Sequence, residues 1–169
     1  MSHDLDESTG KPAMAYVGEK PWHGLGQELP PGQDIDRWVK AAGLDWDIEM
    51  LPVRYQMNDQ SYVMSDRFVL ARSDTQAALS VVSGDYQVVQ PKAVLEFYRD
   101  LSEVAGFELE TAGVLKAGRR FWALARTGKS ACLKGNDVVH SYLLLATSCD
   151  GTLATMAIPT SVRVVCNNT

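Results

Sequence analysis

Residues 138–169 read VVHSYLLLATSCDGTLATMAIPTSVRVVCNNT, and this stretch decides the fold class. Residues 138–146 are almost continuously apolar and rich in β-forming side chains, a pattern typical of a strand that is covered on both faces. The pair Asp150-Gly151 comes next and accepts positive φ cheaply, so it predicts a tight reversing turn. We therefore expect a β-hairpin to begin here.

Two more strands are expected after that turn. Residues 153–158 predict a strand that Pro159 ends, because proline has no amide hydrogen to donate to a ladder. Residues 161–166 predict a third strand, which stops at the polar pair Asn167-Asn168. Strands with so little exposed polarity need the rest of the chain to cover them.

Two amphipathic helices are predicted upstream of these strands. Asp34 is a suitable N-cap for a short helix, and Gly43 suits the position just past its end. A longer helix is expected to begin near Pro91, which the first turn of a helix tolerates, and to end at Gly106. Its apolar stripe follows the helical period at Val94, Phe97, Tyr98, Leu101, Val104 and Ala105.

Short strands are expected in the intervals between the helices. Residues 45–56 predict a strand with Pro52 near a sheet edge, and residues 58–60 predict a turn. Residues 62–71 predict a hairpin that turns at 65–67. Further strands are expected at 79–82 and 86–89, and a second hairpin at 107–127 that turns at 116–118. A polar, lysine-bearing loop is expected at 127–137, before the C-terminal strands. The sequence therefore predicts an α+β fold, with a mainly antiparallel twisted sheet built of hairpins and two helices packed on one face.

The composition is that of one globular domain. Its 169 residues are 46% hydrophobic and 22% charged, which suits a single core. The acidic residues 1–13 contain too little apolar surface to pack, so we expect a disordered tail followed by one domain at 14–169. There is no signal peptide or membrane-length apolar run, and the cysteines are odd in number, so a cytoplasmic location without membrane contact is expected.

The charge is distributed unevenly along the chain. The formal net charge is −5, with −10 in residues 1–113 and +5 in residues 114–169. A globally basic surface is therefore excluded, whereas a local basic face in the C-terminal third is compatible with the sequence.

Metal or covalent catalysis has little support in the sequence. Cys132, Cys149 and Cys166 lie far apart, and His23 and His140 are isolated, so no metal-ligand spacing is present. Cys166 with His140 as its base is the sharpest enzymatic hypothesis, although a cysteine in a buried strand is usually an inert hydrophobe. An enzyme is the third-ranked interpretation, and we expect no cofactor and no metal.

A basic and aromatic strand face carries the strongest functional signal. Alternate residues of a strand share a face, which places Arg120, Trp122 and Arg126 together in the predicted strand 119–127. Arginines neutralise phosphates and an exposed indole stacks on a base, a combination that single-strand binders use. Alternatively, Trp122 packs into the core and the arginines protect a sheet edge. The full candidate set is Lys116, Arg119, Arg120, Trp122, Arg126, Lys129 and Lys134.

A second candidate is the loop KPWHGLG at residues 20–26. Its glycines permit a backbone path that side chains would block, and Trp22 and His23 offer stacking and hydrogen-bonding groups. Prolines follow it instead of a helix, so it is not a dinucleotide fingerprint. Asn167 and Asn168 are further candidates, because amide side chains can bind a ligand or a base edge. The plainer interpretation is that Trp22 fills the core edge and the asparagines end a strand.

Six segments, taken in order, resemble a known family. They are PWHGLG at 21–26, AAGLDW at 41–46, SGDYQVVQP at 83–91, AGVLKAGRRFWALAR at 112–126, YLLLATSCDG at 142–151 and RVVCNNT at 163–169. As a set they resemble the domain-of-unknown-function 932 family of phage/plasmid-like proteins. The resemblance implies a mobile genetic element and the N-terminal portion of a family pattern that continues beyond residue 169. It implies no established activity.

We therefore expect a non-enzymatic mobile-element protein that binds nucleic acid, with single-stranded DNA as the favoured partner, through the hairpin at 116–126. Coating, annealing or protection of DNA would suit such a protein. The alternative is an acidic protein-binding factor that inhibits or engages host defence or replication machinery. Homo-oligomers that assemble through sheet edges are compatible with either interpretation.

Overall fold

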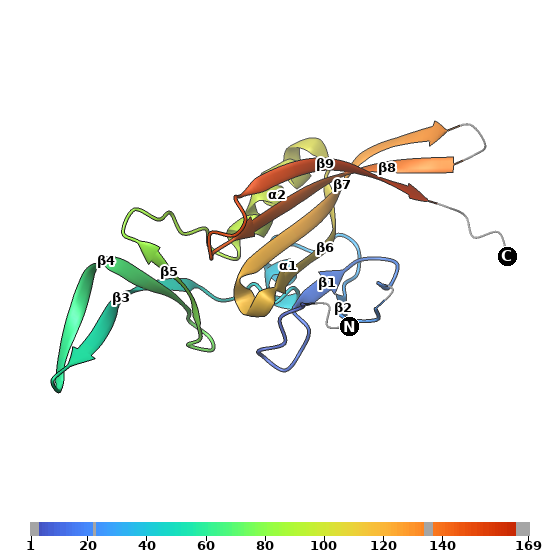
Figure 1. The fold of residues 1–169 in the computed structure, drawn as a ribbon. Helices are drawn as coiled ribbons and strands as arrows, with labels where there is room; N and C mark the ends of the chain where they lie inside the picture. The colour runs from blue at the N-terminus through green and yellow to red at the C-terminus, as the bar shows by residue number, and fades with distance from the viewer. Residues whose placement is uncertain (1–3, 22, 134–136, 165–169) are drawn as a thin grey trace.

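The computed structural model describes residues 4–21, 23–133 and 137–164. Within these residues the chain forms two α-helices, a short 3₁₀ turn and nine strands arranged in two sheets (Figure 1). All strand pairs except β1–β2 are antiparallel, which confirms the α+β class with mainly antiparallel pairing. The sequence predicts one sheet, whereas the structure has a large and a small one.

The large sheet has six strands in the order β2-β1-β6-β7-β8-β9. The first two are short, at Met14–Tyr16 (β1) and Gln27–Glu28 (β2), and the other four form a meander. That meander comprises β6 (Glu108–Leu115), β7 (Arg120–Leu133), β8 (Asp137–Ser148) and β9 (Met156–Val164). The predicted hairpin at 107–127 is therefore present, with the 3₁₀ turn Lys116–Gly118 between its strands.

The two strands predicted after residue 150 are one strand in the structure. Pro159 lies inside β9 opposite Leu143, and residues 149–155 form the connection from β8. The prediction that Pro159 ends a strand was wrong because β9 is the last strand of its sheet, and an edge strand tolerates a residue without an amide hydrogen. Likewise, β7 continues through the segment expected as a loop after residue 127, with a bulge between Arg126 and Ser130.

Both predicted helices are present. In α1 (Ile35–Ala41) the side chain of Asp34 caps the N-terminus by accepting from the amide of Arg37 at 2.7 Å. In α2 (Ala93–Ala105) the chain leaves the helix at Gly106, whose φ of 67° is left-handed. Helix α2 packs against β6, β7 and β8 and also contacts α1, so the two helices lie beside one another against the large sheet. Neither described helix is long and apolar enough to cross a membrane.

The core lies between α2 and the large sheet. Alternate residues of β7 point toward the helix and are buried, namely Phe121, Ala123 and Ala125. Tyr98 of α2 is fully buried too, and its hydroxyl is 2.7 Å from the carbonyl oxygen of Leu143, to which it donates. The face of β7 that carries Trp122 points the other way and is partly exposed, as the alternation in the sequence predicts.

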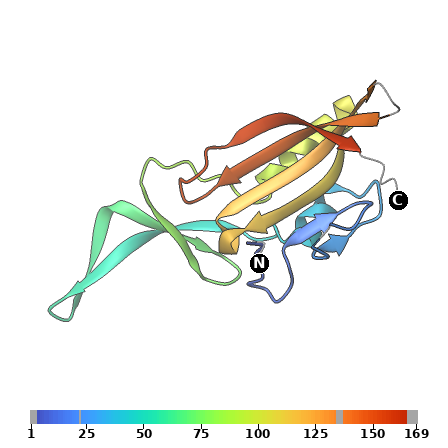
Figure 2. The same cartoon turned by 45° about the vertical axis from the view of Figure 1, so that its right-hand side comes forward.

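The small sheet has the order β3-β4-β5, with β3 at Ile48–Met57, β4 at Gln60–Arg72 and β5 at Ala78–Ser83. The hairpin predicted within 62–71 is instead one long strand. The turn predicted at 58–60 is present and joins β3 to β4, with left-handed φ values of 50° at Asn58 and 61° at Asp59. Figures 1 and 2 show β3 and β4 projecting from the body as a long ribbon. The strand expected at 86–89 is an irregular connection to α2.

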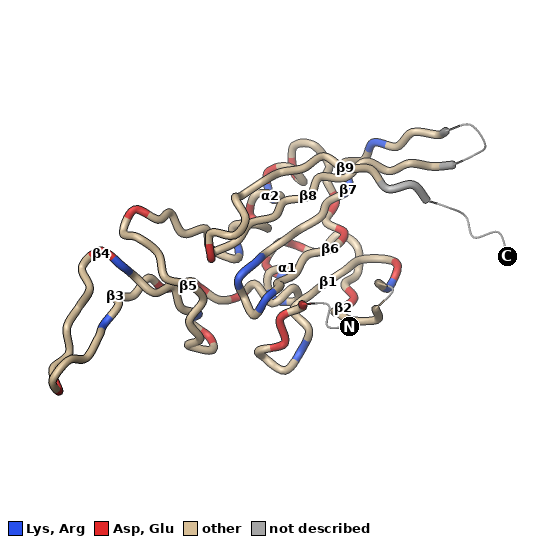
Figure 3. Tube along the Cα trace, in the orientation of Figure 1, with Lys and Arg blue, Asp and Glu red and all other residues tan. Residues whose placement is uncertain are grey.

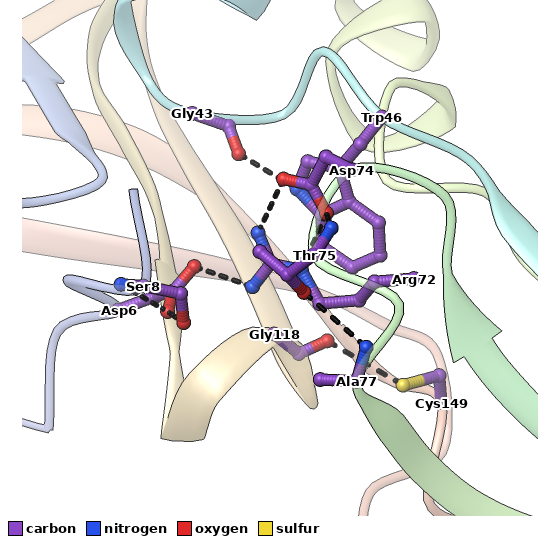
Figure 4. Close-up of polar contacts among 10 residues, drawn as sticks. All are labelled: Asp6, Ser8, Gly43, Trp46, Arg72, Asp74, Thr75, Ala77, Gly118 and Cys149. Atoms are coloured by element: carbon purple, nitrogen blue, oxygen red, sulfur yellow. Dashed lines mark hydrogen bonds and ion pairs between the residues drawn. The ribbon is translucent and has the colours of Figure 1, made fainter. Parts of the chain in front are cut away.

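Residues 4–13 of the acidic N-terminal segment pack against the rest of the protein. This differs from the prediction of a disordered tail at residues 1–13. Asp6 is only 3% exposed and pairs with the buried guanidinium of Arg72 at 2.6 Å (Figure 4). The amide of Asp6 also donates to the carbonyl of Val114. The prediction failed because hydrogen bonds and a buried ion pair replace the apolar contacts that the segment lacks.

Candidate nucleic-acid interface

The helices cover one face of the large sheet, and the opposite face is open. Strand pairing places Trp122 opposite Ala146 of β8 and Leu124 opposite Leu144, so these four side chains share the open face. Arg120 lies on the same face opposite Ser148. The open face therefore carries an apolar centre with an arginine at one end.

A hollow of about 450 Å³ lies on this open face. Its walls are mainly apolar side chains from the sheet and from the segments beside it, including Met14, Leu115 and Leu153. Trp122, Arg120 and His23 supply the aromatic and polar groups. Among the described residues that line the hollow, none is an aspartate or a glutamate, so the guanidinium of Arg120 sets the charge of its wall.

Trp122 is positioned by the glycine opposite it. Gly113 of β6 pairs with Trp122, and a Cβ at Gly113 would lie 3.1 Å from an atom of the indole ring. The absence of a side chain at Gly113 thus lets the indole approach the neighbouring strand. The indole stays partly exposed at the wall of the hollow instead of entering the helix-covered core. The core alternative for Trp122 is therefore wrong.

Arg120 is held at the rim by a weak contact. Its Nε and Nη2 lie 3.3 and 3.1 Å from the hydroxyl of Thr152, which accepts from them. The same hydroxyl donates to Asp150, and Arg120 is among the groups that hold the pKa of that carboxyl below its ordinary value against the effect of burial. Arg120 makes no direct ion pair with any residue that the structure describes.

Arg126 is in a different situation from Arg120, although both lie on the same strand face. It pairs with Glu110 at 3.6 Å, and its guanidinium lies 5.8 Å from the centre of the Tyr142 ring. A hydrogen bond to the Tyr142 hydroxyl is the main cause of the raised pKa of Arg126, with the neighbouring glutamates adding to it. Its charge is therefore largely balanced within the protein.

The remaining basic candidates are spread along the sheet. Lys116 is exposed in the turn before β7, and blue segments mark its lysine and the arginines that follow it in Figure 3. Arg119 donates from Nε to the carbonyl of Leu79 at 3.0 Å, so it ties the turn to the small sheet. Lys129 is exposed nine positions along β7 from Arg120 and borders a separate hollow. The structure brings Lys116 and Arg120 to one end of β7 and leaves Lys129 apart.

The glycine-rich loop and the hairpin, which are separate candidates in the sequence, meet at this hollow. His23 lines the same hollow as Trp122, and its Nδ1 accepts a hydrogen bond from the amide of Leu25 at 3.1 Å, which orients the ring. The other candidates Trp22, Lys134, Asn167 and Asn168 lie outside the described residues. Leu5 and Leu153 also line the hollow, although no local pattern in the sequence predicts that they do.

The described cysteines and histidines offer no assembled catalytic group. Cys149 is buried, and burial raises the pKa of its thiol to about 11, so the nucleophilic thiolate is scarce at neutral pH. Cys166, the nucleophile of the enzymatic hypothesis, lies outside the described residues. No three metal-binding side chains gather in residues 4–21, 23–133 and 137–164.

Comparison with known proteins identifies one family. A family model with the description "Domain of unknown function (DUF932)" matches residues 78–169, slightly more than half of the chain. The match runs from β5 through α2 to the end of the large sheet, and so covers the C-terminal part of this chain. No curated protein and no solved structure matches. The resembling segments at 21–26 and 41–46 lie before the matched range.

Proposed function

The chain belongs to the DUF932 family, whose description assigns no activity, and we propose that this member binds single-stranded DNA on the open face of its large sheet. One base enters the hollow and stacks on Trp122, while a neighbouring phosphate lies against Arg120. The observation that carries this proposal is the convergence of a partly exposed indole, an arginine and an imidazole in one hollow, with no carboxylate among the described residues that line it.

The hollow has the dimensions and chemistry that a base requires. Its volume of about 450 Å³ lies within the range of small-ligand sites, which are apolar with a few polar groups that orient the ligand. A base stacked on an aromatic side chain gains about 1–3 kcal/mol, and every base offers a face for stacking. His23 and Arg120 can donate hydrogen bonds to base edges or to phosphate.

The distribution of charge also favours nucleic-acid binding at the end of β7 that borders the hollow. Arg120 lines the hollow, and Lys116 lies in the turn that precedes the same end of β7. Residues 114–169 carry a net charge of +5 although the chain as a whole is acidic. The acidic surplus lies in residues 1–113, and it would repel phosphates from other surfaces. This charge distribution agrees with DNA binding that is limited to the hollow and the adjacent turn of the large sheet.

The ion pair between Arg126 and Glu110 reduces the set of phosphate-binding residues that the sequence predicted. A phosphate near Arg126 would have to compete with Glu110, whose carboxylate already balances the guanidinium. We therefore assign phosphate binding to Arg120 and Lys116, and we expect Arg126 to contribute little. This distinction supplies a matched pair of arginines on one face of one strand.

Fluorescence-polarisation titration of a labelled single-stranded oligonucleotide, at low and moderate salt, tests the proposal. We expect salt-sensitive binding by the wild type, and about tenfold weaker binding by Arg120→Gln or Trp122→Leu. Arg126→Gln is the matched control and should change the affinity less than twofold. No binding at low salt, or an equal loss for Arg126→Gln, would overturn the proposal.

A further inference from the structure

Another hollow, of about 370 Å³, lies between the two helices and the first strand of the meander. Its lining comes from the segment that leads into α1, from the C-terminal half of α2 and from the start of β6. It shares no lining residue with the hollow proposed to bind DNA. We call it the helix pocket.

The floor of the helix pocket is apolar and belongs to the core. Ile35 and Trp38 of α1 are buried, and Val17, Phe107 and Leu109 pack against the same core while staying partly exposed. Side chains fixed in this way form a surface for the apolar part of a ligand. The volume of the pocket lies within the range of small-ligand sites.

The rim of the helix pocket is acidic. Asp34, Glu103 and Glu108 line it from three separate segments, and all three are exposed. Arg99 is the one basic side chain among the described residues that line the pocket, and it already pairs with Asp36 at 3.3 Å. Together with Asp36, the charged side chains of the rim carry a net charge of −3. The rim therefore favours a cationic ligand.

The C-terminus of α2 adds to the negative potential at the rim. The carbonyl groups at the end of a helix carry partial negative charge, which basic side chains in the last turn usually balance. The last turn of α2, which the structure describes completely, has no basic side chain and contains Glu103 instead. Glu103 makes no ion pair with any residue in the described part of the chain. A bound cation would relieve this repulsion.

We propose that the helix pocket binds an aliphatic polyamine of the size of spermidine. The methylene chain lies on the apolar floor, and the ammonium groups pair with the carboxylates of the rim. A basic peptide suits the pocket less well, because its backbone amide and carbonyl groups would need hydrogen-bond partners that the apolar floor does not offer. Binding here leaves the proposed DNA site free, since the two sites share no residue.

Isothermal titration calorimetry of nuclease-treated protein with spermidine, at moderate salt, tests the proposal. We expect one saturable site with a dissociation constant on the order of 100 µM or lower. The double variant Glu103→Gln/Glu108→Gln should bind spermidine at least about tenfold more weakly. Glu96→Gln/Asp100→Asn is the matched control, because it removes the same charge from exposed positions of α2 outside the pocket. It should change the affinity less than about twofold.

Two further probes with the charge of spermidine identify what the pocket recognises. Hexaamminecobalt(III) lacks the methylene chain, and acetylated trilysine amide carries its ammonium groups on a peptide. We expect both to bind the wild type at least about tenfold more weakly than spermidine does. No saturable binding of spermidine up to about 5 mM would overturn the proposal, as would an equal loss in the control variant. Binding of either probe as tight as that of spermidine would overturn it too.

Discussion

Arg72 shows how one residue joins distant parts of the chain. Its buried guanidinium pairs with Asp6 at 2.6 Å and with Asp74 at 2.8 Å, and lies 4.1 Å from the centre of the Trp46 ring. Burial alone would lower the pKa of Arg72, but the two carboxylates reverse the shift and keep it raised. The guanidinium of Arg72 therefore stays charged, and its ion pair with Asp6 joins the N-terminal segment to the small sheet (Figure 4).

Asp6→Asn should therefore destabilise the protein by about 3 kcal/mol at neutral pH, because it leaves a buried guanidinium without one of its partners. Burial by itself raises the pKa of Asp6, but hydrogen bonds from Arg72 and Ser8 outweigh it and the pKa is lowered. The stabilisation is complete above the ordinary value of 3.8 and is lost as the pH falls through the lower folded-state pKa.

Urea unfolding of wild type and Asp6→Asn between neutral and acidic pH measures both effects. The difference in unfolding free energy should narrow as the pH falls below about 4. Asp4→Asn is the control, since Asp4 is exposed two positions away and should change stability by less than about 0.5 kcal/mol. A constant difference across the pH range would contradict this account of Asp6.

At the scale of elements, local composition located the helices, the alternating strand β7 and the turns at 58–60 and 116–118, but it also predicted a turn at 65–67 that the structure lacks. Ser65-Asp66-Arg67 and Asn58-Asp59-Gln60 are both polar and both typical of turns, yet residues 65–67 lie within β4 and only the second segment turns the chain. Tertiary pairing decides between two such candidates. Pro159 was misread for the same reason, because its strand lies at a sheet edge and no local signal marks an edge.

The turn between β6 and β7 allows a prediction about element packing. Gly118 has a φ of +94°, and a Cβ there would lie 2.8 Å from Nη1 of Arg72. Gly118→Ala should therefore cost more than the backbone penalty of about 1 kcal/mol. Gly151→Ala isolates that penalty, because Gly151 has a φ of +73° with nothing within 4 Å. Equal losses of thermal stability in the two variants would contradict the packing described for Gly118.

At the scale of the whole molecule, the candidate site depends on contacts between distant segments. The sequence predicted that Arg120 and Trp122 share a strand face, because side chains alternate along a strand. It gave no sign that His23 lines the same hollow as Trp122, nor that Glu110 balances Arg126, since both arrangements arise from strand order and register. The small sheet and the packing of the N-terminal segment were not predicted for the same reason, because both depend on contacts between segments that are distant in the sequence.

The most direct measurement is photo-crosslinking of single-stranded DNA that contains 5-iodouracil, followed by tryptic peptide mapping. Cleavage after Arg120 and Arg126 releases residues 121–126, the peptide that contains Trp122. Stacking of a base on Trp122 predicts that the crosslink lies in this peptide and disappears with excess unlabelled strand. A specific crosslink confined to residues 55–67, the tryptic peptide that spans the turn between β3 and β4, would contradict the assignment of DNA binding to the open face of the large sheet.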